Sequence, residues 1–200
     1  MAEVRRPDFS DGLVHLTRER KEYEEATEPF DRPKVKRKIA AFDVLKEILV
    51  EGKINGSGND GYVKGHRKVV CFSEVPLSAV QHFASPPDAV NARYRYYGIS
   101  VSKKALFNAG GRPVIYLPDR DATWIPAEEK WRHVRFDYGK VDFTHEREWR
   151  IPDELKLQDM PGLYVLVWSA TEAKEVQSLQ TPLKPLIRGV LPMQHLTKFL

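Results

Sequence analysis

The chain has 200 residues, of which 42% are hydrophobic and 30% are charged, and its formal net charge is +4. These values exclude a disordered or collagen-like chain and are ordinary for one globular domain. A single cysteine, Cys71, excludes an internal disulfide and a cysteine-based zinc site. No apolar run approaches the ~18 residues of a membrane helix, and the first ten residues lack the apolar segment of a signal peptide. A cytoplasmic protein without a membrane partner is therefore expected.

The first third of the chain predicts a strand, a charged segment and a helix. Residues 12–17 (GLVHLT) favour a short strand, and the highly charged residues 18–38 favour a loop or an exposed helix. Residues 39–51 carry apolar side chains at helical spacing and are followed by Gly52, which predicts a helix with a defined end. Residues 55–65 contain four glycines without a P-loop or Rossmann pattern, so this segment is expected to be a loop.

The rest of the chain alternates short apolar runs with turn residues. Strands are predicted over residues 68–74, 97–101, 113–117, 142–151 and 163–168, and helical segments over 76–83, 103–109 and 171–178. No regular long helices separate the strands, so a doubly wound parallel sheet is not expected. The pattern favours an α+β fold with a split, mostly antiparallel sheet and short flanking helices.

The strongest local feature is a pair of carboxylates in the predicted strand 142–151. Strand alternation places Glu146 and Glu148 on one side, together with Arg150. If the site is enclosed, the like charge raises at least one pKa and gives a useful acid–base or cation-stabilising pair. The alternative is an exposed edge strand with a solvated charged face.

Other candidate residues lie near the first strand and the strand at 68–74. His15 and Thr17 share one side of their strand and suit the hydroxyls of a ribose, although a strand histidine is more often structural. Arg67 lies just before the later strand, where its planar fork suits a phosphate. Ser73 could orient a catalytic carboxylate by a hydrogen bond. Cys71 lies in an apolar run and is expected to be a buried small hydrophobe rather than a nucleophile.

The distribution of histidines and basic residues bears on ligands. The six histidines show no HxxxH or HExxH spacing, so no metal is expected. No GxSxG elbow indicates a serine hydrolase. Basic residues at 32–38, and others interleaved with tyrosines at 93–97, suit phosphates and bases. A solvated charged surface explains both clusters equally well.

The order of these features resembles the ADP-ribosyltransferase fold, in which NAD lies in a cleft between two small sheets. The segments LVHLTR and FDVLKEILVEGKI are similar to the opening of DarT-like nucleic-acid ADP-ribosyltransferases and of AbiGi-type abortive-infection proteins. RKVVCFSEVPLSAV and YRYYGISVSKKALFNAGGRPVIYL are similar to the AbiGi-type middle. FTHEREWRIPDEL resembles the strand that bears the transferase glutamate. The resemblance covers roughly residues 12–157 and implies one domain over residues 1–200, with its core at about 12–170.

The resemblance also implies roles for individual residues. It assigns NAD binding to His15, Thr17, Ser73 and Tyr97, with Tyr96 as the alternative for stacking on nicotinamide. It assigns catalysis to Glu148 as the transferase carboxylate, to Glu146 at the acceptor, and to Arg67 at the NAD phosphates or the acceptor. These roles require His15 and Glu148 to converge on one pocket wide enough for a dinucleotide.

The implied function is an NAD-dependent ADP-ribosyltransferase of a bacterial toxin or phage-defence system. NAD is its substrate, no metal is needed, and nucleic acid, DNA or RNA, is the expected acceptor. A co-encoded antitoxin or toxin protein is a further expected partner. One alternative is a non-catalytic antitoxin or immunity module with the same fold. Another is phosphotransfer or hydrolysis at RNA ends.

Overall fold

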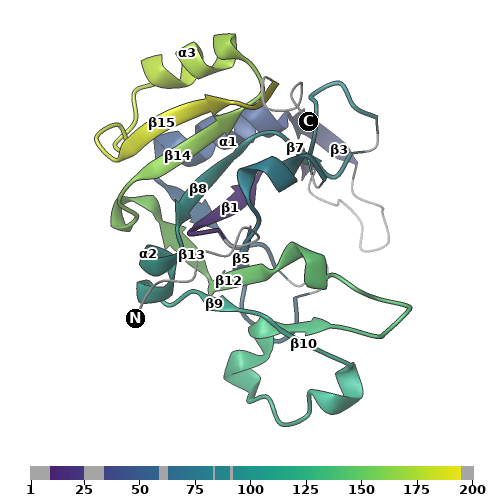
Figure 1. Cartoon of the computed structure of the whole chain (residues 1–200). Helices are drawn as coiled ribbons and strands as arrows, with labels where there is room; N and C mark the ends of the chain where they lie inside the picture. Colours follow the sequence, from purple (N-terminus) through teal and green to yellow (C-terminus); the bar gives the residue numbers. More distant parts are fainter. Residues whose placement is uncertain (1–9, 25–33, 59–62, 83, 91, 195–200) are drawn as a thin grey trace.

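A central sheet of seven strands organises the molecule (Figure 1). The computed structural model describes residues 10–24, 34–58, 63–82, 84–90 and 92–194. In spatial order the strands are β15 (Ile187–Pro192), β14 (Leu163–Val167), β8 (Gly98–Ser102), β1 (Gly12–Leu16), β5 (Val69–Ser73), β12 (Glu148–Pro152) and β9 (Arg112–Pro113). Within this sheet, among the described residues, only β14 and β15 pair in parallel. The predicted α+β fold with a mostly antiparallel sheet is confirmed.

Four small two-stranded sheets surround the central one. They pair β2 (Arg20–Tyr23) with β3 (Val35–Ile39), β4 (Lys53–Asn55) with β13 (Glu154–Lys156), β6 (Ala84–Ser85) with β7 (Tyr94–Arg95), and β10 (Ile115–Leu117) with β11 (His133–Arg135). The α-helices are α1 (Ala41–Glu51), α2 (Lys103–Asn108) and α3 (Ala170–Ser178). Short 3-10 helices of one or two turns cover Leu77–His82, Asp119–Asp121, Ala127–Arg132, Thr144–Glu146 and Leu157–Asp159.

The helices form where the local sequence predicts them. The N–H of Gly52 donates to the Ile48 carbonyl with φ 71°, a left-handed conformation that glycine adopts without strain. Ser102 begins α2 by accepting a hydrogen bond from the Ala105 N–H at 3.4 Å. All three helices contribute side chains to one hydrophobic core, which includes Leu45 of α1, together with Leu13 and Phe72 of the central sheet. The helices therefore cover one face of the sheet.

The sheet is joined weakly at its middle. Strand β1 follows β8 along its whole length, from Gly12↔Ser102 to Leu16↔Gly98, and β5 follows β12 in the same way. Between β1 and β5 the register holds only Val14↔Ser73. The sheet therefore consists of two halves that meet at this pair, in agreement with the predicted split.

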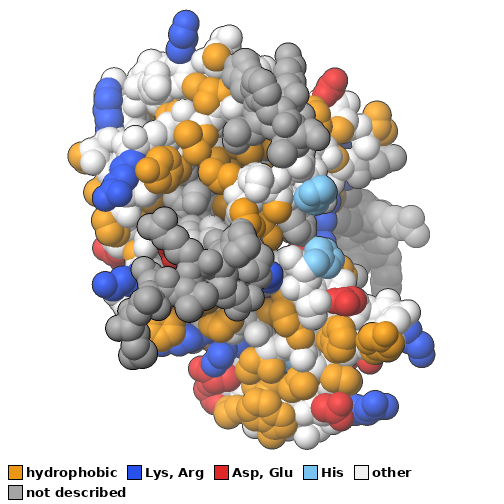
Figure 2. All heavy atoms as spheres, viewed as in Figure 1, with side chains coloured by type: hydrophobic (Ala, Val, Ile, Leu, Met, Phe, Trp, Pro, Cys, Tyr) orange, Lys and Arg blue, Asp and Glu red, His pale blue; other side chains and the backbone are white. Residues whose placement is uncertain are grey.

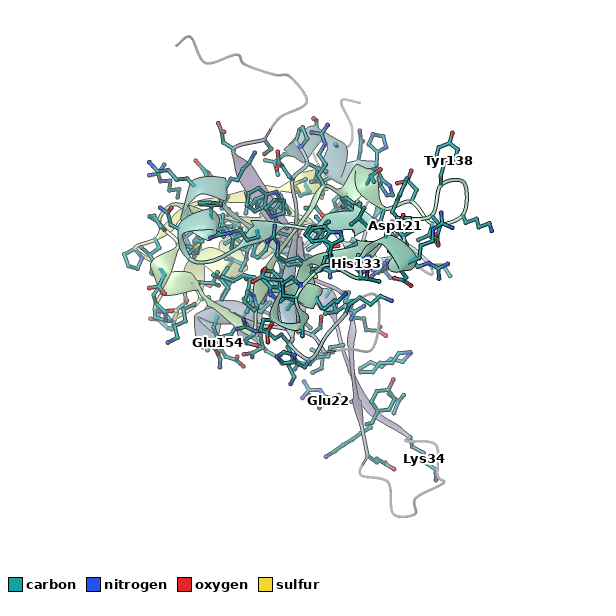
Figure 3. The ribbon with its side chains drawn as sticks, turned by 90° about the horizontal axis from the view of Figure 1, so that it is seen from below. Glu22, Lys34, Asp121, His133, Tyr138 and Glu154 are labelled. Carbon is teal, nitrogen blue, oxygen red and sulfur yellow. The ribbon has the colours of Figure 1, made fainter. Side chains whose placement is uncertain are left out.

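Residues 18–38 differ from the predicted loop or helix. They contain the antiparallel strands β2 and β3, with residues 25–33 outside the described part of the chain. Figure 3 shows these strands projecting from the body, with Glu22 and Lys34 labelled along the projection. Charged side chains occupy both faces of this ribbon, so the apolar alternation that usually predicts a strand is missing.

The predicted strand 142–151 is correct only in its second half. The Asp142 carboxylate accepts hydrogen bonds from the Thr144 N–H at 2.9 Å and hydroxyl at 2.6 Å, which starts a turn rather than a strand. A 3-10 turn follows, Arg147 has φ 45°, and β12 begins at Glu148. The expectation that strand alternation aligns Glu146 with Glu148 is therefore wrong.

Two other predicted strands are corrected in detail. The predicted buried strand 113–117 is divided into β9 and β10, and the residues of β10 are only half-buried. The predicted central strand 163–168 corresponds to β14, which is well buried but lies next to the edge strand β15.

A lobe built around β10 and β11 lies below the sheet in the view of Figure 1. Figure 2 shows hydrophobic side chains gathered on the surface of this lobe, and Trp124 and Tyr138 are among the exposed large hydrophobics of the chain. The lobe also carries Trp131 and His133, whose backbone carbonyls bind a buried arginine of β12. In the part of the chain that the structure describes, no helix combines the length and apolar character required to cross a bilayer.

Candidate active site

A buried ion pair stands at the beginning of β12. Arg150 Nε donates to Glu148 Oε1 at 2.8 Å, and Arg150 Nη2 donates to Glu148 Oε2 at 3.2 Å. The two residues are only 2% and 9% exposed. Such a two-pronged contact fixes both planar groups relative to each other. The orientation of the Glu148 carboxylate is therefore set by Arg150.

Arg150 is itself anchored to the neighbouring lobe. Its Nη1 donates to the Trp131 carbonyl at 2.7 Å and lies 3.4 Å from the His133 carbonyl. A buried guanidinium needs acceptors for its several donors, and these contacts supply them. Glu148, Arg150 and the lobe thus form one connected polar group.

Glu146 lies beside this group although it is not on the strand. Burial raises the pKa of the Glu146 carboxyl, and the charge of Glu148 raises it further, while Arg93 opposes the shift. The structure therefore brings the two predicted carboxylates together through the turn at 144–147. One is held by a guanidinium, and the other has a raised affinity for a proton.

Two tyrosines complete the polar group. The Tyr116 hydroxyl accepts a hydrogen bond from the Glu148 N–H at 3.0 Å, and burial raises the pKa of Tyr116 to about 12. Burial also raises the pKa of Tyr94, on which the charges of Arg93 and Glu146 act in opposite directions. Tyr116 was not predicted as a site residue. The only indication in the sequence was its hydroxyl, a single polar group in the apolar segment PVIYL.

Cys71 lies opposite Arg150 in the register of β5 and β12. Burial, and then the charge of Glu148, raise the pKa of the Cys71 thiol far above its usual range. A thiol that stays protonated is a poor nucleophile. This disfavours the nucleophile interpretation, but Cys71 is half-buried rather than buried as predicted.

His15 lies at the split in the sheet. Its Nδ1 is 2.9 Å from the Cys71 carbonyl, and its ring centroid is 5.6 Å from that of Phe72. Because a carbonyl only accepts, Nδ1 carries the proton in this bond and Nε2 is the acceptor nitrogen. Burial lowers the pKa of His15, so the imidazole is neutral at pH 7.

The register decides which face each residue occupies. Val14, Ser73 and Glu148 are successive cross-strand partners and share one face, so alternation places His15 on the other. His15 and Glu148 therefore do not lie on a common face as the roles implied by the resemblance require. They are connected through Cys71, whose carbonyl bonds His15 and whose thiol lies near the Glu148 carboxylate.

Thr17 and Tyr97 have side chains that are committed to the fold. The Thr17 hydroxyl lies 2.8 Å from the Ala41 carbonyl and 3.2 Å from the Tyr97 carbonyl, which ties the end of β1 to the start of α1. The Tyr97 hydroxyl donates to Glu172 Oε1 at 2.6 Å, and its ring packs on Phe42. Both side chains are buried away from the Glu148 group.

Arg67 and Ser73 lie at opposite ends of the strand pair β5–β12. Arg67 Nη2 contacts Asp153 Oδ2 at 2.5 Å in an exposed ion pair. Asp153 follows Glu148 by five positions, which corresponds to roughly 16 Å at about 3.3 Å per residue. Ser73 is the direct register partner of Glu148. The structure thus brings Ser73, but not Arg67, to the carboxylate pair.

A second buried carboxylate lies next to Ser73. Glu74 Oε1 accepts from Lys103 Nζ at 2.7 Å, and Glu74 Oε2 accepts from Trp149 Nε1 at 2.8 Å. This contact ties the end of β5 to α2 and β12. Glu74 therefore has a structural function beside the predicted site residue Ser73.

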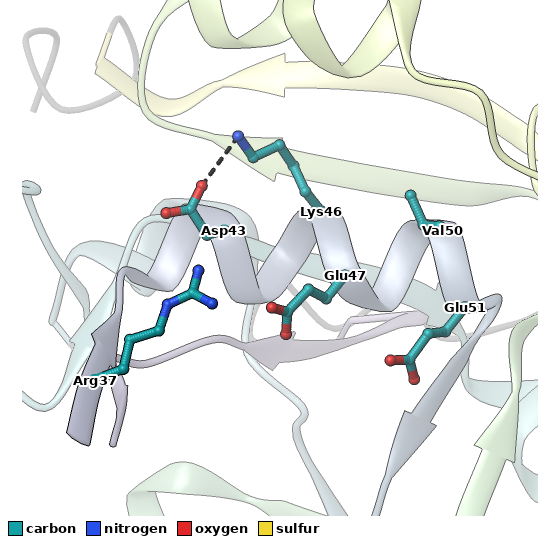
Figure 4. A pocket seen from close by; sticks show the side chains of 6 residues that line it. All are labelled: Arg37, Asp43, Lys46, Glu47, Val50 and Glu51. Carbon is teal, nitrogen blue, oxygen red and sulfur yellow. Dashed lines mark ion pairs between the residues drawn. The ribbon is translucent and has the colours of Figure 1, made fainter. Parts of the chain in front are cut away.

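A hollow of about 350 Å³ lies on the outer side of α1, far along the chain from Glu148 (Figure 4). Its lining residues are Arg37, Asp43, Lys46, Glu47, Val50 and Glu51. Charged side chains surround it, and Lys46 pairs with Asp43 at 3.0 Å. Among the described residues, no group of three histidine, cysteine, aspartate or glutamate side chains is placed to hold a metal ion.

No family model matches the chain, and no curated protein matches it. Among solved structures, the chain is similar to DarT from Thermus sp. 2.9, which was solved in complex with NAD+. The sequence identity is 13% and the TM-score is 0.41, over 90% of this chain and 95% of that chain. The assignment of a function therefore depends on the side chains around Glu148.

Proposed function

We propose that this protein is an NAD-dependent ADP-ribosyltransferase with Glu148 as its catalytic carboxylate. The observation that supports it most is the carboxylate pair: Glu148 is fixed by Arg150, and burial raises the pKa of Glu146 beside it. Two acids in different environments can divide charge stabilisation and proton transfer between them. The order of the sequence motifs, which resembles that of ADP-ribosyltransferases, supports the same reaction.

In the proposed reaction the bond between the nicotinamide nitrogen and the ribose C1′ breaks, and its electron pair leaves with nicotinamide. The ribose then carries an oxocarbenium-like positive charge, which the Glu148 carboxylate stabilises as it develops. The acceptor atom forms the new bond to C1′. Its proton passes to Glu146, because a carboxylate with a raised pKa is the stronger base.

The NAD-binding residues are proposed in part from the same geometry. Ser73 is the register partner of Glu148, and this supports its proposed contact with the ribose. His15 would offer Nε2 as an acceptor to a ribose hydroxyl, provided that NAD reaches the split between β1 and β5. Thr17 is proposed to support the site through its backbone contacts, and Tyr97 through its contact with α3. Arg67 is proposed to act outside the carboxylate pair.

Nucleic acid is the proposed acceptor, and the cytoplasm the proposed place of action. The net charge of +4 and the basic residues of the β2–β3 projection support a polyanionic substrate. The similarity of the middle segment to abortive-infection proteins supports a role as a toxin or in phage defence.

The proposal is tested by nicotinamide release from NAD in the presence of DNA, RNA or protein acceptors. Glu148→Gln should lower the rate by about 10²–10³. Glu148→Asp keeps the charge but withdraws it by one methylene, so it separates loss of catalysis from loss of folding. Absence of any nicotinamide release by the wild type, with all three acceptors, would contradict the proposal.

One observation favours a second function, a non-catalytic antitoxin or immunity module. Both carboxylate oxygens of Glu148 are already bonded to Arg150, as in a purely structural ion pair. In that case NAD should leave the melting temperature unchanged, and a co-encoded protein should co-purify as a stable complex.

A further inference from the structure

The projection formed by β2 and β3 concentrates positive charge. We define the arm as residues 18–24 and 34–38. It holds seven basic residues (Arg18, Arg20, Lys21, Lys34, Lys36, Arg37 and Lys38) and three acidic ones (Glu19, Glu22 and Glu24). The described residues of the arm thus have a net charge of +4. The connecting residues 25–33 contain three acidic residues and one basic residue, so the whole segment 18–38 has a net charge of +2.

One face of the arm is neutralised by the body. Arg20 Nη2 contacts Glu47 Oε2 of α1 at 2.7 Å and Glu22 at 3.6 Å. Arg37 is the register partner of Glu22, and Figure 4 shows its guanidinium directed towards α1 between Asp43 and Glu47. The charge of Arg20 on this inner face is therefore paired with the body, and Arg37 lies opposite Glu22 and faces α1.

The other face carries positive charges without such compensation. Lys21 and Lys38 are direct register partners, so two like charges lie opposite each other on the outer face. Both are exposed, as is Lys36 at the irregularity in β3. No carboxylate of the described residues lies within salt-bridge distance of these three lysines. Like charges directly opposite on a sheet destabilise it, so the fold alone does not explain this pair.

An aromatic side chain extends the same face. Alternation places Tyr23 after Lys21, and Tyr23 pairs with Val35 in the register. Their side chains are among the exposed large hydrophobics, at 53% and 44%. Exposed aromatic rings among basic residues stack on nucleic-acid bases, and a two-stranded ribbon fits the major groove of duplex DNA.

We propose that the outer face of the arm is a nucleic-acid-binding surface, with Lys21, Lys36 and Lys38 on the phosphodiester backbone and Tyr23 against a base or sugar. A protein partner fits less well, because protein interfaces are depleted in lysine. The inference rests on the proposed function and deepens it by giving the acceptor a docking surface. Strand β1, which carries His15, leads directly into the arm.

Arg18, at the base of the arm, follows His15 by three positions. The charge of Arg18 lowers the pKa of both His15 and Tyr94, although burial is the larger influence on each. Tyr94 in turn lies near Glu146.

The test is fluorescence anisotropy of the full chain, without NAD, on a labelled 20-base-pair DNA duplex, the single strand, and RNA of the same sequence. The variant Lys21→Gln/Lys36→Gln/Lys38→Gln should bind at least ten times more weakly than wild type at low salt. The slope of log affinity against log salt should fall by about 2–3, because each phosphate contact contributes ~0.7–0.9. The matched control Lys156→Gln/Lys174→Gln/Lys184→Gln removes the same charge from exposed positions elsewhere and should bind like wild type.

Equal binding by the arm variant and its control would overturn the inference. Failure of wild type to bind any of the three probes would also overturn it. So would release of the bound probe by poly-L-glutamate as readily as by unlabelled nucleic acid. The arm variant should melt no lower than wild type, because it relieves the Lys21–Lys38 repulsion. Comparison with the nicotinamide-release assay separates the two proposals: if wild type binds nucleic acid through the arm but releases no nicotinamide with any acceptor, the arm stands and the enzymatic proposal fails.

Discussion

Arg150 and Glu148 lie two positions apart on β12 and form a two-pronged ion pair, with Nε–Oε1 at 2.8 Å and Nη2–Oε2 at 3.2 Å. Both are buried, and Arg150 continues to the Trp131 carbonyl of the neighbouring lobe. The pair thus joins the carboxylate group to the lobe. It makes the position of Glu148 depend on a residue that need not touch any substrate.

Removal of Arg150 should destabilise the protein strongly. Arg150→Met leaves the Glu148 carboxylate buried without its partner, which should lower the free energy of unfolding by about 3–5 kcal/mol. The double variant Glu148→Gln/Arg150→Met should recover part of this loss, because no charge then remains unpaired. Urea denaturation at pH 7 measures both. If the free energy of unfolding of Arg150→Met falls by less than ~1 kcal/mol, the pair behaves as a solvent-exposed ion pair.

Glu146 should make stability depend on pH in the acidic range. Burial, and then Glu148, raise its pKa above 4.5, so folding favours the protonated form. The ionised Glu146 therefore destabilises the protein once the pH exceeds its folded-state pKa, and this cost disappears as the pH falls towards 4.5.

Glu146→Gln should accordingly melt above wild type at pH 7, and the difference should vanish near pH 4. The control Glu128→Gln, at an exposed position, should melt like wild type throughout. A Glu146→Gln variant that is less stable than wild type at pH 7 would show that the carboxylate is well solvated or paired.

His15 should contribute stability that is lost in mild acid. Burial lowers its pKa below 6.5, so its contribution is present above pH 6.5 and is lost as the pH falls through the folded-state pKa. His15→Asn can keep a donor to the Cys71 carbonyl but cannot titrate. Its melting temperature should therefore fall less than that of wild type between pH 7 and 5. If the melting temperature of His15→Asn depends on pH as that of wild type does, the imidazole is solvated rather than buried. The matched control is His66→Asn, at an exposed position.

Thr17 should act through stability rather than through ribose binding. Thr17→Val leaves the Ala41 and Tyr97 carbonyls without their hydroxyl partner, which should cost about 1–3 kcal/mol of unfolding free energy. Thr17→Ser should keep most of it. Calorimetric titration measures NAD binding by the same variant. If Thr17→Val weakens NAD binding while its stability is unchanged, the ribose role implied by the sequence resemblance is correct.

Features with a local cause were predictable from the sequence. Helix α1 is capped at its end by Gly52, and α2 is capped at its start by Ser102, because both caps act within a few residues. The buried strands β5 and β14 also show as continuous apolar runs. Each of these elements carries its own signal.

Features that depend on register or on distant partners were not predictable. The face that His15 occupies relative to Glu148 follows from the single β1–β5 pair Val14↔Ser73, which joins positions far apart in the chain. Tyr116 meets Glu148 across 32 positions. The turn before β12 was missed although it has a local cause, because the alternation of 142–151 outweighed the Asp142 turn signal.

The central claim is that Glu148 stabilises the ribosyl cation, and the rate of transfer of labelled ADP-ribose from NAD to nucleic acid tests it most directly. Wild type and the exposed control Glu128→Gln should transfer at equal rates, whereas Glu148→Gln, still folded by circular dichroism, should be slower by about 10²–10³. Equal transfer by Glu148→Gln and wild type would contradict the account.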